Sequence, residues 1–378
     1  ISKGTYCRNV HHDYLVPERS SGIATISTGA YPDVHGIISD YWYERLKEDI
    51  VFSIFDNDVN TVGGKYGTGN YSPANLLSMT LSDQLLISNK LKSKVISISL
   101  DPRTAVISGG HAANGSYWYD DFTGNWITSS FYTDSLPAWV DTFNLKRLPD
   151  IYLEKEWNTL YPIEEYTESL SDDNPYEMGI NEKITFPYDM DKISKIKRNE
   201  RDYKVLKYSP YGNTYTTDFT IDAILSEDLG KDNYTDWLNI NYTAGSYIDD
   251  LYSSWSIEVE DIYLRLDREI EHFLNFIDNE IGLKNVLIYL TADNGIANEP
   301  AYLMEKRIPS GYFNYNSALS LLSTYLNVIY GKGDWIKFYY AQQIYLDRNL
   351  IEDSRLSIPE FQDRIARFMV QFEGVSNA

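Results

Sequence analysis

The sequence predicts an α/β fold in which a parallel sheet is flanked by helices. Helical and strand patterns alternate along the chain, which is typical of βαβ units. Twice, an amphipathic helix is followed by an apolar run of strand length, once near residue 95 and once near residue 286. The second run leads into a polar loop, and open parallel sheets place their sites at such strand ends. We therefore expect a functional site at the carboxyl ends of the strands.

The first helix and strand are expected between residues 72 and 100. Ser72 followed by Pro73 is a common helix start, because proline fits the first helical position. Helical spacing continues to about residue 91 through Leu76, Leu77, Leu81, Leu85 and Leu86. Residues 95–100 then have the apolar composition of a buried strand.

The second helix and strand are expected between residues 259 and 290. Apolar residues recur every three or four positions, as one face of an amphipathic helix requires: Val259, Ile262, Leu266, Ile270, Phe273 and Ile277. Gly282 ends the pattern, and residues 286–290 are expected to form the strand that leads into the loop of residues 291–295.

The remaining segments are less periodic, and we divide the chain into five parts. Residues 1–150 form the first part of the α/β domain, 151–215 a polar surface insertion and 216–304 the second part of the core. Residues 305–355, with a helix near 316–326 and two short strands, predict a cap or β-ribbon insertion, and 356–378 a terminal helix.

The charge and composition exclude several classes of partner. The chain has 33 Lys and Arg against 55 Asp and Glu, a formal net charge of −22. Nucleic acid and anionic lipid surfaces are therefore expected to repel it. No stretch reaches the roughly 18 apolar residues of a transmembrane helix. A single cysteine, Cys7, excludes an internal disulfide and a cysteine-based zinc site.

Several long strings identify a family resemblance. They are STGAYPDVHGI at residues 27–37, YWY at 41–43, Arg103, and GGHAANGSYWYD at 109–120. Together they resemble the alkaline phosphatase superfamily, in the branch of Thr-nucleophile phosphomonoesterases and type I phosphodiesterase/nucleotide pyrophosphatases, over essentially the whole chain. The resemblance implies a doubly wound, mostly parallel sheet flanked by helices, with a smaller cap-like insertion. Relative to the family, the chain looks truncated at both ends.

The resemblance also implies a catalytic site, in which this sequence departs from the family pattern. The position of the nucleophilic Thr is occupied by Arg19, with the hydroxyls of Ser20 and Ser21 beside it. An Asn that contacts the phosphate is replaced by Asp40. The family's Lys-Asp-Arg phosphate clamp reads Asp101, Pro102, Arg103, so that only the Arg is kept.

The metal positions implied by the resemblance are altered as well. The family holds two zinc ions with Asp and His side chains. The equivalent positions here are Ser246, Asp250, Asp293 and Asn294. Two more ligands would lie outside the 378 residues. None of the five histidines, His11, His12, His35, His111 and His272, is at a ligand position. We expect His35 and His111 instead to order loops through hydrogen bonds.

These departures lead to an expected loss of catalysis. The sequence predicts an inactive, phosphatase-like protein that acts as a binding or scaffold component of an exported, periplasmic or cell-envelope assembly. It would have no cofactor, and Arg19 would replace zinc by neutralising Asp293 and Asp250. Protein partners are expected, and nucleic acid is not. One alternative is a zinc-dependent phosphomonoesterase or phosphodiesterase with a remodelled metal site; another is a carbohydrate-binding protein that uses exposed Tyr and Trp.

Overall fold

The chain divides into two compact units. The computed structural model describes residues 4–15, 17–197, 200–243 and 251–378. Unit 1 comprises Ile1–Asp40 and Phe52–Ala297, and unit 2 comprises Tyr41–Val51 and Asn298–Ala378. In the described part of the chain, no helix is both long enough and apolar enough to span a membrane.

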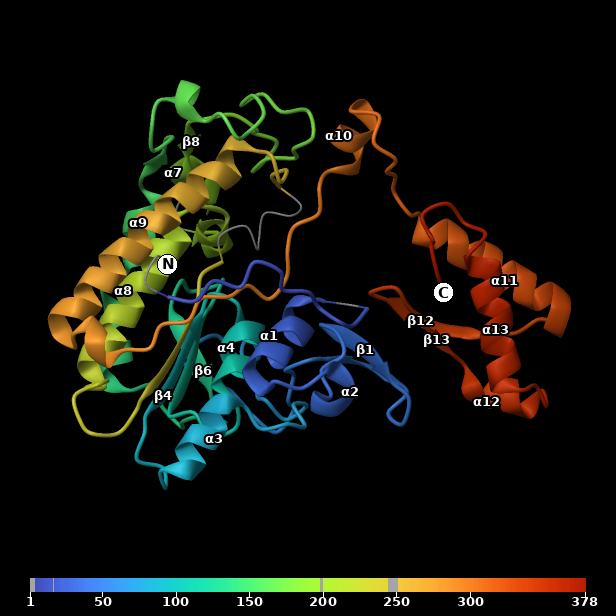
Figure 1. Ribbon diagram of the computed structural model, residues 1–378, viewed down its shortest axis with the longest axis horizontal. Helices are drawn as coiled ribbons and strands as arrows, with labels where there is room; N and C mark the ends of the chain where they lie inside the picture. Colours follow the sequence, from blue (N-terminus) through green and yellow to red (C-terminus); the bar gives the residue numbers. More distant parts are fainter. Residues whose placement is uncertain (1–3, 16, 198–199, 244–250) are drawn as a thin grey trace. The chain divides into compact units, whose positions relative to one another are not determined.

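Unit 1 is built on a mixed sheet with the strand order β11-β4-β5-β6-β3 (Figure 1). Its strands are β3 (Thr61–Val62), β4 (Val95–Ser99), β5 (Gly115–Tyr119), β6 (Trp126–Ser129) and β11 (Trp237–Asn241). The β11, β4 and β5 strands are parallel, whereas β6 pairs antiparallel with β5 and β3. The crossover from β4 to β5 is α4 (Pro102–Gly109). This arrangement confirms the predicted α/β fold.

Helices cover both faces of this sheet (Figure 1). On one side, α4 packs with α1 (Arg19–Thr28). On the other lie α8 (Tyr211–Ser226) and α9 (Ile257–Glu280). Trp126 of β6 stacks on Phe219 of α8, with ring centroids 4.4 Å apart. One layer of the core therefore lies between the sheet and α8, and Ala24, Val106 and Ile107 are buried on the side of α1 and α4.

Shorter elements complete unit 1. They are α2 (Pro32–His35), α3 (Leu81–Ser88), α5 (Ala138–Leu145), α6 (Leu148–Leu153), β7 (Glu156–Trp157), β8 (Tyr188–Asp189), α7 (Met190–Ser194), β9 (Lys195–Lys197), β10 (Glu200–Arg201) and three 3₁₀ turns, Ile163–Glu165, Tyr203–Tyr208 and Leu283–Asn285. Within the 151–215 segment, Trp157, Tyr188 and Met190 are fully buried. The segment thus contributes to the core, through aromatic residues spaced too widely to produce a periodic pattern.

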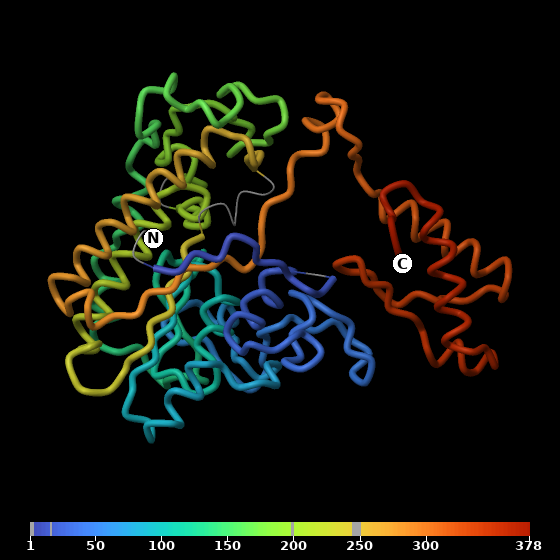
Figure 2. The backbone as a smooth tube through the Cα atoms, viewed as in Figure 1, coloured from blue at the N-terminus to red at the C-terminus, as the bar shows by residue number. Residues whose placement is uncertain are grey.

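Two predicted elements of unit 1 differ from the structure. The helix expected from residue 72 begins only at α3, where Thr80 and Asp83 form reciprocal side-chain caps. The backbone of residues 286–290 can be followed in Figure 2, and these residues belong to no strand, so that the predicted strand is wrong. The place beside β4 is taken by β11 in parallel register. Within residues 286–290, Leu287 is 95% exposed.

Unit 2 contains the predicted β-ribbon, formed by the antiparallel strands β12 (Ile336–Tyr340) and β13 (Gln343–Leu346). Its other elements are β1 (Tyr41–Glu44), β2 (Asp49–Phe52), α10 (Pro300–Glu305), α11 (Tyr315–Tyr330), α12 (Arg348–Asp353) and α13 (Ile358–Met369). Leu322, Phe361 and Ile365 join α11 and α13 in one hydrophobic cluster. The terminal helix α13 therefore packs against α11, in the segment that also contains the β-ribbon. The boundaries of the five predicted segments stay a prediction.

Candidate active site

Two helix N-termini meet where the parallel strand β4 ends. Asp101 follows β4 and is the N-cap of α4, its side chain accepting a hydrogen bond from the backbone N–H of Arg103. Arg19 is the first residue of α1, which packs against α4. The fold therefore brings Arg19, Asp40, Asp101 and Arg103 together at the carboxyl end of β4.

These four side chains form a network of ion pairs centred on Asp101. The Arg19 guanidinium donates from Nη1 to Asp101 Oδ2 at 2.5 Å. Arg103 donates from Nη2 to the same oxygen at 2.5 Å and from Nε to Oδ1 at 3.0 Å. Its Nη1 pairs with Asp40. Each guanidinium thus already has a carboxylate partner.

Burial and charge act in opposite directions on Asp101. The side chain is 1% exposed, and burial by itself would raise the pKa of the carboxyl. The positive charges of Arg103 and then Arg19 outweigh burial and hold the pKa of Asp101 far below its ordinary value. Asp101 is therefore an anion at neutral pH, with both arginines as its counter-charges.

The hydroxyl of Ser20 is also bound within the network. Ser20 Oγ donates to Asp40 Oδ1 at 2.5 Å and lies 2.9 Å from Ser53 Oγ. The Ser20 backbone N–H donates to the same Asp40 oxygen, and Ser20 has no exposed surface. Ser21 Oγ caps the start of α1 by accepting from the backbone N–H of Glu18. In this arrangement neither hydroxyl faces solvent as a free nucleophile would.

Asp293 reaches the same place from the loop after residues 286–290. Burial raises the pKa of its carboxyl, while the charge of Arg19 lowers it and that of Asp101 raises it. Arg19 thus acts on Asp293 through its charge, and it forms an ion pair with Asp101. The predicted substitution of zinc by Arg19 stays a prediction, because Ser246 and Asp250 lie outside the described residues.

The close approach of Asp293 depends on glycine at position 22. A Cβ atom there would lie 2.6 Å from the Asp293 carbonyl oxygen. We expect Gly22→Ala to displace the Asp293 backbone and to lower the free energy of unfolding by about 1–3 kcal/mol, measured by urea denaturation. Gly295→Ala is the control, because a Cβ at Gly295 meets open space. Equal stability of the two variants would contradict this packing.

The two motif histidines order loops, as predicted. His35 Nδ1 accepts from the backbone N–H of Ile37, and its Nε2 lies 3.1 Å from Thr25 Oγ1. Burial lowers the pKa of His35 to about 4, so its ring is neutral. His111 contacts Asp83 at 3.1 Å, and this contact raises the pKa of His111.

The described residues by themselves do not fit a zinc centre. Among residues 4–15, 17–197, 200–243 and 251–378, no group of three or more His, Cys, Asp or Glu side chains is placed to hold a metal ion. At the site, Asp293 is the kept carboxylate, and Asn294 stands where the family has histidine. Structural and catalytic zinc sites use at least three protein donors of the Cys, His or carboxylate type.

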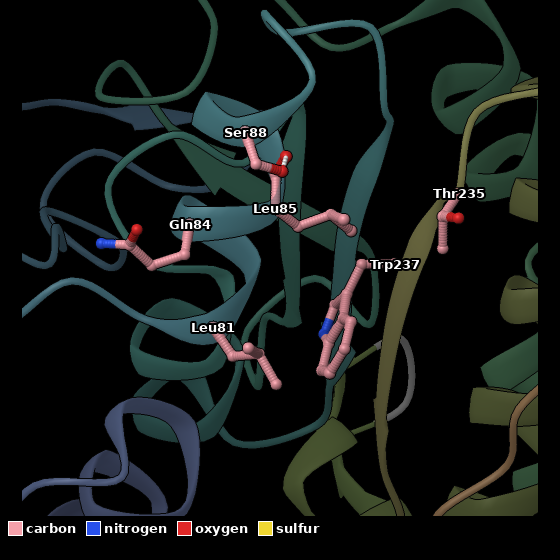
Figure 3. A pocket seen from close by; sticks show the side chains of 6 residues that line it. All are labelled: Leu81, Gln84, Leu85, Ser88, Thr235 and Trp237. Carbon is pink, nitrogen blue, oxygen red and sulfur yellow. Dashed lines mark hydrogen bonds between the residues drawn. The ribbon is translucent and has the colours of Figure 1, made fainter.

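A separate apolar hollow lies away from this site. Leu81 and Leu85 project from α3 toward Trp237, and the lining also includes Gln84, Ser88 and Thr235 (Figure 3). Trp237 pairs with Val95 at the amino end of the parallel strands, whereas Asp101 follows the carboxyl end. The hollow presents no ionisable side chain, so it is not the place for phosphate chemistry.

The ion-pair partners in the site could not be read from the sequence. The resemblance supplied the four positions 19, 40, 101 and 103, but not the bonds of Asp101 to both arginines or of Ser20 to Asp40. A partial signal was the Asp-Pro pair at 101–102, since Asp followed by Pro is a typical helix start.

Comparison with known proteins gives the family. Residues 1–350 match the model of the type I phosphodiesterase/nucleotide pyrophosphatase family. The chain is 36% identical to alkaline phosphatase PhoV of Synechococcus elongatus, over all of this chain and 68% of PhoV. It is 35% identical to alkaline phosphatase PafA of Elizabethkingia meningoseptica, over 97% of this chain and 66% of PafA. The crystal structure of wild-type PafA superposes with a TM-score of 0.89 at 35% identity, covering 97% of this chain and 69% of that one.

These relatives overturn the expected inactive scaffold. Proteins that match essentially the whole of this chain at 35–36% identity are named as alkaline phosphatases. The prediction of a catalytically inactive binding component is therefore wrong. That prediction relied on substitutions at single positions and gave too little weight to the similarity to named alkaline phosphatases along the whole chain. The chain belongs to the type I phosphodiesterase/nucleotide pyrophosphatase family, within the alkaline phosphatase superfamily.

Proposed function

We propose that this protein hydrolyses phosphoric esters at the site around Arg103, with a metal site remodelled relative to its relatives. The single observation that carries the proposal is the position of Arg103. It is the clamp residue kept from the family pattern, and it lies at the N-terminus of α4, at the end of a parallel strand. The named activity of PhoV and PafA supports the reaction class.

Arg103 is suited to contact a phosphoryl group. A guanidinium offers paired N–H donors that match two phosphate oxygens, and such charge-assisted bonds are stronger than neutral ones. The N-terminal ends of α1 and α4 add partial positive charge. Arg19 supplies a second guanidinium that shares Asp101 with Arg103.

The carboxylates oppose this binding. A phosphoryl group that enters must displace Asp40 or Asp101 from Arg103, or lie beside them with like charge. We therefore expect weaker substrate binding than in an enzyme with Asn and Lys at these two positions. We expect the charge swap to lower both affinity and rate.

Only the membership of the family supports a metal ion in this proposal. The described residues supply Asp293 and lack the further donors that zinc requires. Asp250, outside the described residues, is the other carboxylate that the sequence offers, and the remaining donors would come from elsewhere. If bound, zinc would act as a Lewis acid on a phosphoryl oxygen. An exported or periplasmic location is likewise part of the proposal and rests on the same resemblance.

Turnover of two chromogenic esters tests the proposal. The purified protein is expected to hydrolyse p-nitrophenyl phosphate, bis-p-nitrophenyl phosphate or both when zinc is supplied, and to lose that activity on chelation. The ratio of the two rates distinguishes a monoesterase from a diesterase. Absence of turnover of either ester in the presence of zinc would refute the proposal.

A further inference from the structure

Two buried carboxyl groups outside the active site face each other. Glu258, in the first turn of α9, has no exposed surface. Glu177, on the loop of residues 169–180, lies near enough for the charge of Glu258 to act on it. In the part of the chain that the structure describes, Oε2 of Glu177 and Oε2 of Glu258 are both buried and meet no donor group. Two carboxylates could not satisfy each other, because both would be acceptors.

The other oxygen of each carboxyl indicates where a proton lies. Tyr188 OH donates to Glu258 Oε1 at 2.6 Å, which favours the ionised form of Glu258, as does its place at a helix N-terminus. Asn174 Nδ2 donates to Glu177 Oε1 at 2.6 Å. Glu177 Oε1 is therefore already occupied as an acceptor, and Oε2 is the oxygen of Glu177 that is left to carry a proton.

We propose that Glu177 is protonated in the folded protein and donates its Oε2 proton to Oε2 of Glu258, so that the pair is a pH-sensitive latch between the 169–180 loop and α9. One shared proton satisfies both orphaned oxygens and removes one of two adjacent buried negative charges. Carboxyl pairs in other proteins share a proton for the same reason.

The loop that carries Glu177 also forms backbone hydrogen bonds with residues 251–256. The Leu170 N–H donates to the Trp255 carbonyl at 2.8 Å. The Met178 and Gly179 N–H groups both donate to the Leu251 carbonyl, at 3.1 and 2.8 Å. Loss of the shared proton would leave two buried negative charges at this point, and the loop that carries Glu177 can separate from α9 to relieve them.

The surrounding charges reinforce the shared proton. Burial and then the charge of Glu258 raise the pKa of Glu177, and burial raises the pKa of Glu258 against the hydrogen bond from Tyr188. The ionisable groups near the pair are Asp172, Tyr188, Tyr252 and Asp261. Two of these carboxylates have a basic neighbour: the charge of Lys183 lowers the pKa of Asp172, and Arg265 forms an ion pair with Asp261. The acidic neighbours favour the protonated form.

The sign of the pH effect follows from these directions. The folded state holds the proton more tightly than the unfolded chain, whose Glu has a pKa near 4.5. Stability from the pair is therefore complete at acid pH and is lost as the pH rises through neutral into the alkaline range. Opening releases one proton in this pH range, so the equilibrium between the closed and open loop changes by about tenfold per pH unit.

Hydrogen exchange of the whole protein tests the latch. After correction for intrinsic exchange, opening of the 170–180 segment is expected to increase between pH 6 and pH 9.5, by up to about tenfold per unit. Glu177→Gln should abolish this increase, because the glutamine amide donates to Glu258 at every pH. Glu182→Gln, an exposed change two residues beyond that segment, is the control and should behave as the wild type.

Infrared difference spectra provide a second readout on the unmodified chain. A protonated carboxyl band is expected at pH 7, lost at alkaline pH, and missing from Glu177→Gln. A wild-type protein without that band would overturn the proposal. A 170–180 segment whose opening does not depend on pH, or depends on it equally in Glu177→Gln, would overturn it as well.

Discussion

Replacing Asp101 by asparagine is expected to lower the free energy of unfolding by about 3 kcal/mol or more. Breaking a buried ion pair from one side leaves the partner charge uncompensated, which costs about 3–5 kcal/mol. Here one carboxylate serves two guanidiniums, those of Arg19 and Arg103. The variant keeps the size of the side chain, so that packing changes little. The measurement is urea denaturation at neutral pH.

A surface ion pair gives the matched control for Asp101. Lys146 pairs with Asp222, whose side chain is 31% exposed, and Asp222→Asn should cost at most about 1 kcal/mol. The pKa of Asp101 is depressed, so its contribution is present above the ordinary Asp value and is lost as the pH falls far into the acid range. A cost for Asp101→Asn no larger than that of Asp222→Asn would show that the network does not stabilise the fold.

Replacing Arg103 by alanine is expected to lower kcat/KM for phosphate esters by about 100-fold. Removing one donor that stabilises charge in a transition state typically costs about 10²–10³ in rate. Arg103 provides such a donor at the end of β4, and its side chain is still partly exposed, at 20%. The measurement is steady-state hydrolysis of p-nitrophenyl phosphate with zinc supplied.

Two further variants separate a phosphate contact from a structural effect. Arg103→Lys keeps the charge and loses the paired donors, and an intermediate rate is expected. Arg147→Ala removes an exposed arginine that pairs with Asp150 and should leave the rate unchanged. Full activity in Arg103→Ala would show that the phosphoryl group binds elsewhere.

The sequence predicted those parts of the fold whose signals are local. The stripe from Val259 to Ile277 indicated α9, and the apolar residues 95–100 indicated β4. It gave no signal for α8, because that helix is buried on several faces, with Asn213, Thr216 and Thr220 in the interior. Residues 286–290 have strand composition but no strand structure, since a strand depends on a partner that local sequence does not specify.

The candidate site was likewise predicted only in part from the sequence. Resemblance to a family located Arg19, Asp40, Asp101 and Arg103, because those positions follow recognisable strings. Their ion pairs join residues up to 82 positions apart, and such contacts follow from the fold alone. Judging function from the single substitutions was misleading, since each position was weighed without the rest of the chain.

The central claim is that this chain hydrolyses phosphoric esters at the site around Arg103. The most direct measurement compares hydrolysis of p-nitrophenyl phosphate by the wild type and by Arg103→Ala, prepared identically, with zinc and then with a chelator. We predict a rate in the wild type that falls by about 100-fold in the variant and that is lost on chelation. No rate in the wild type, or equal rates in the two proteins, would contradict the account.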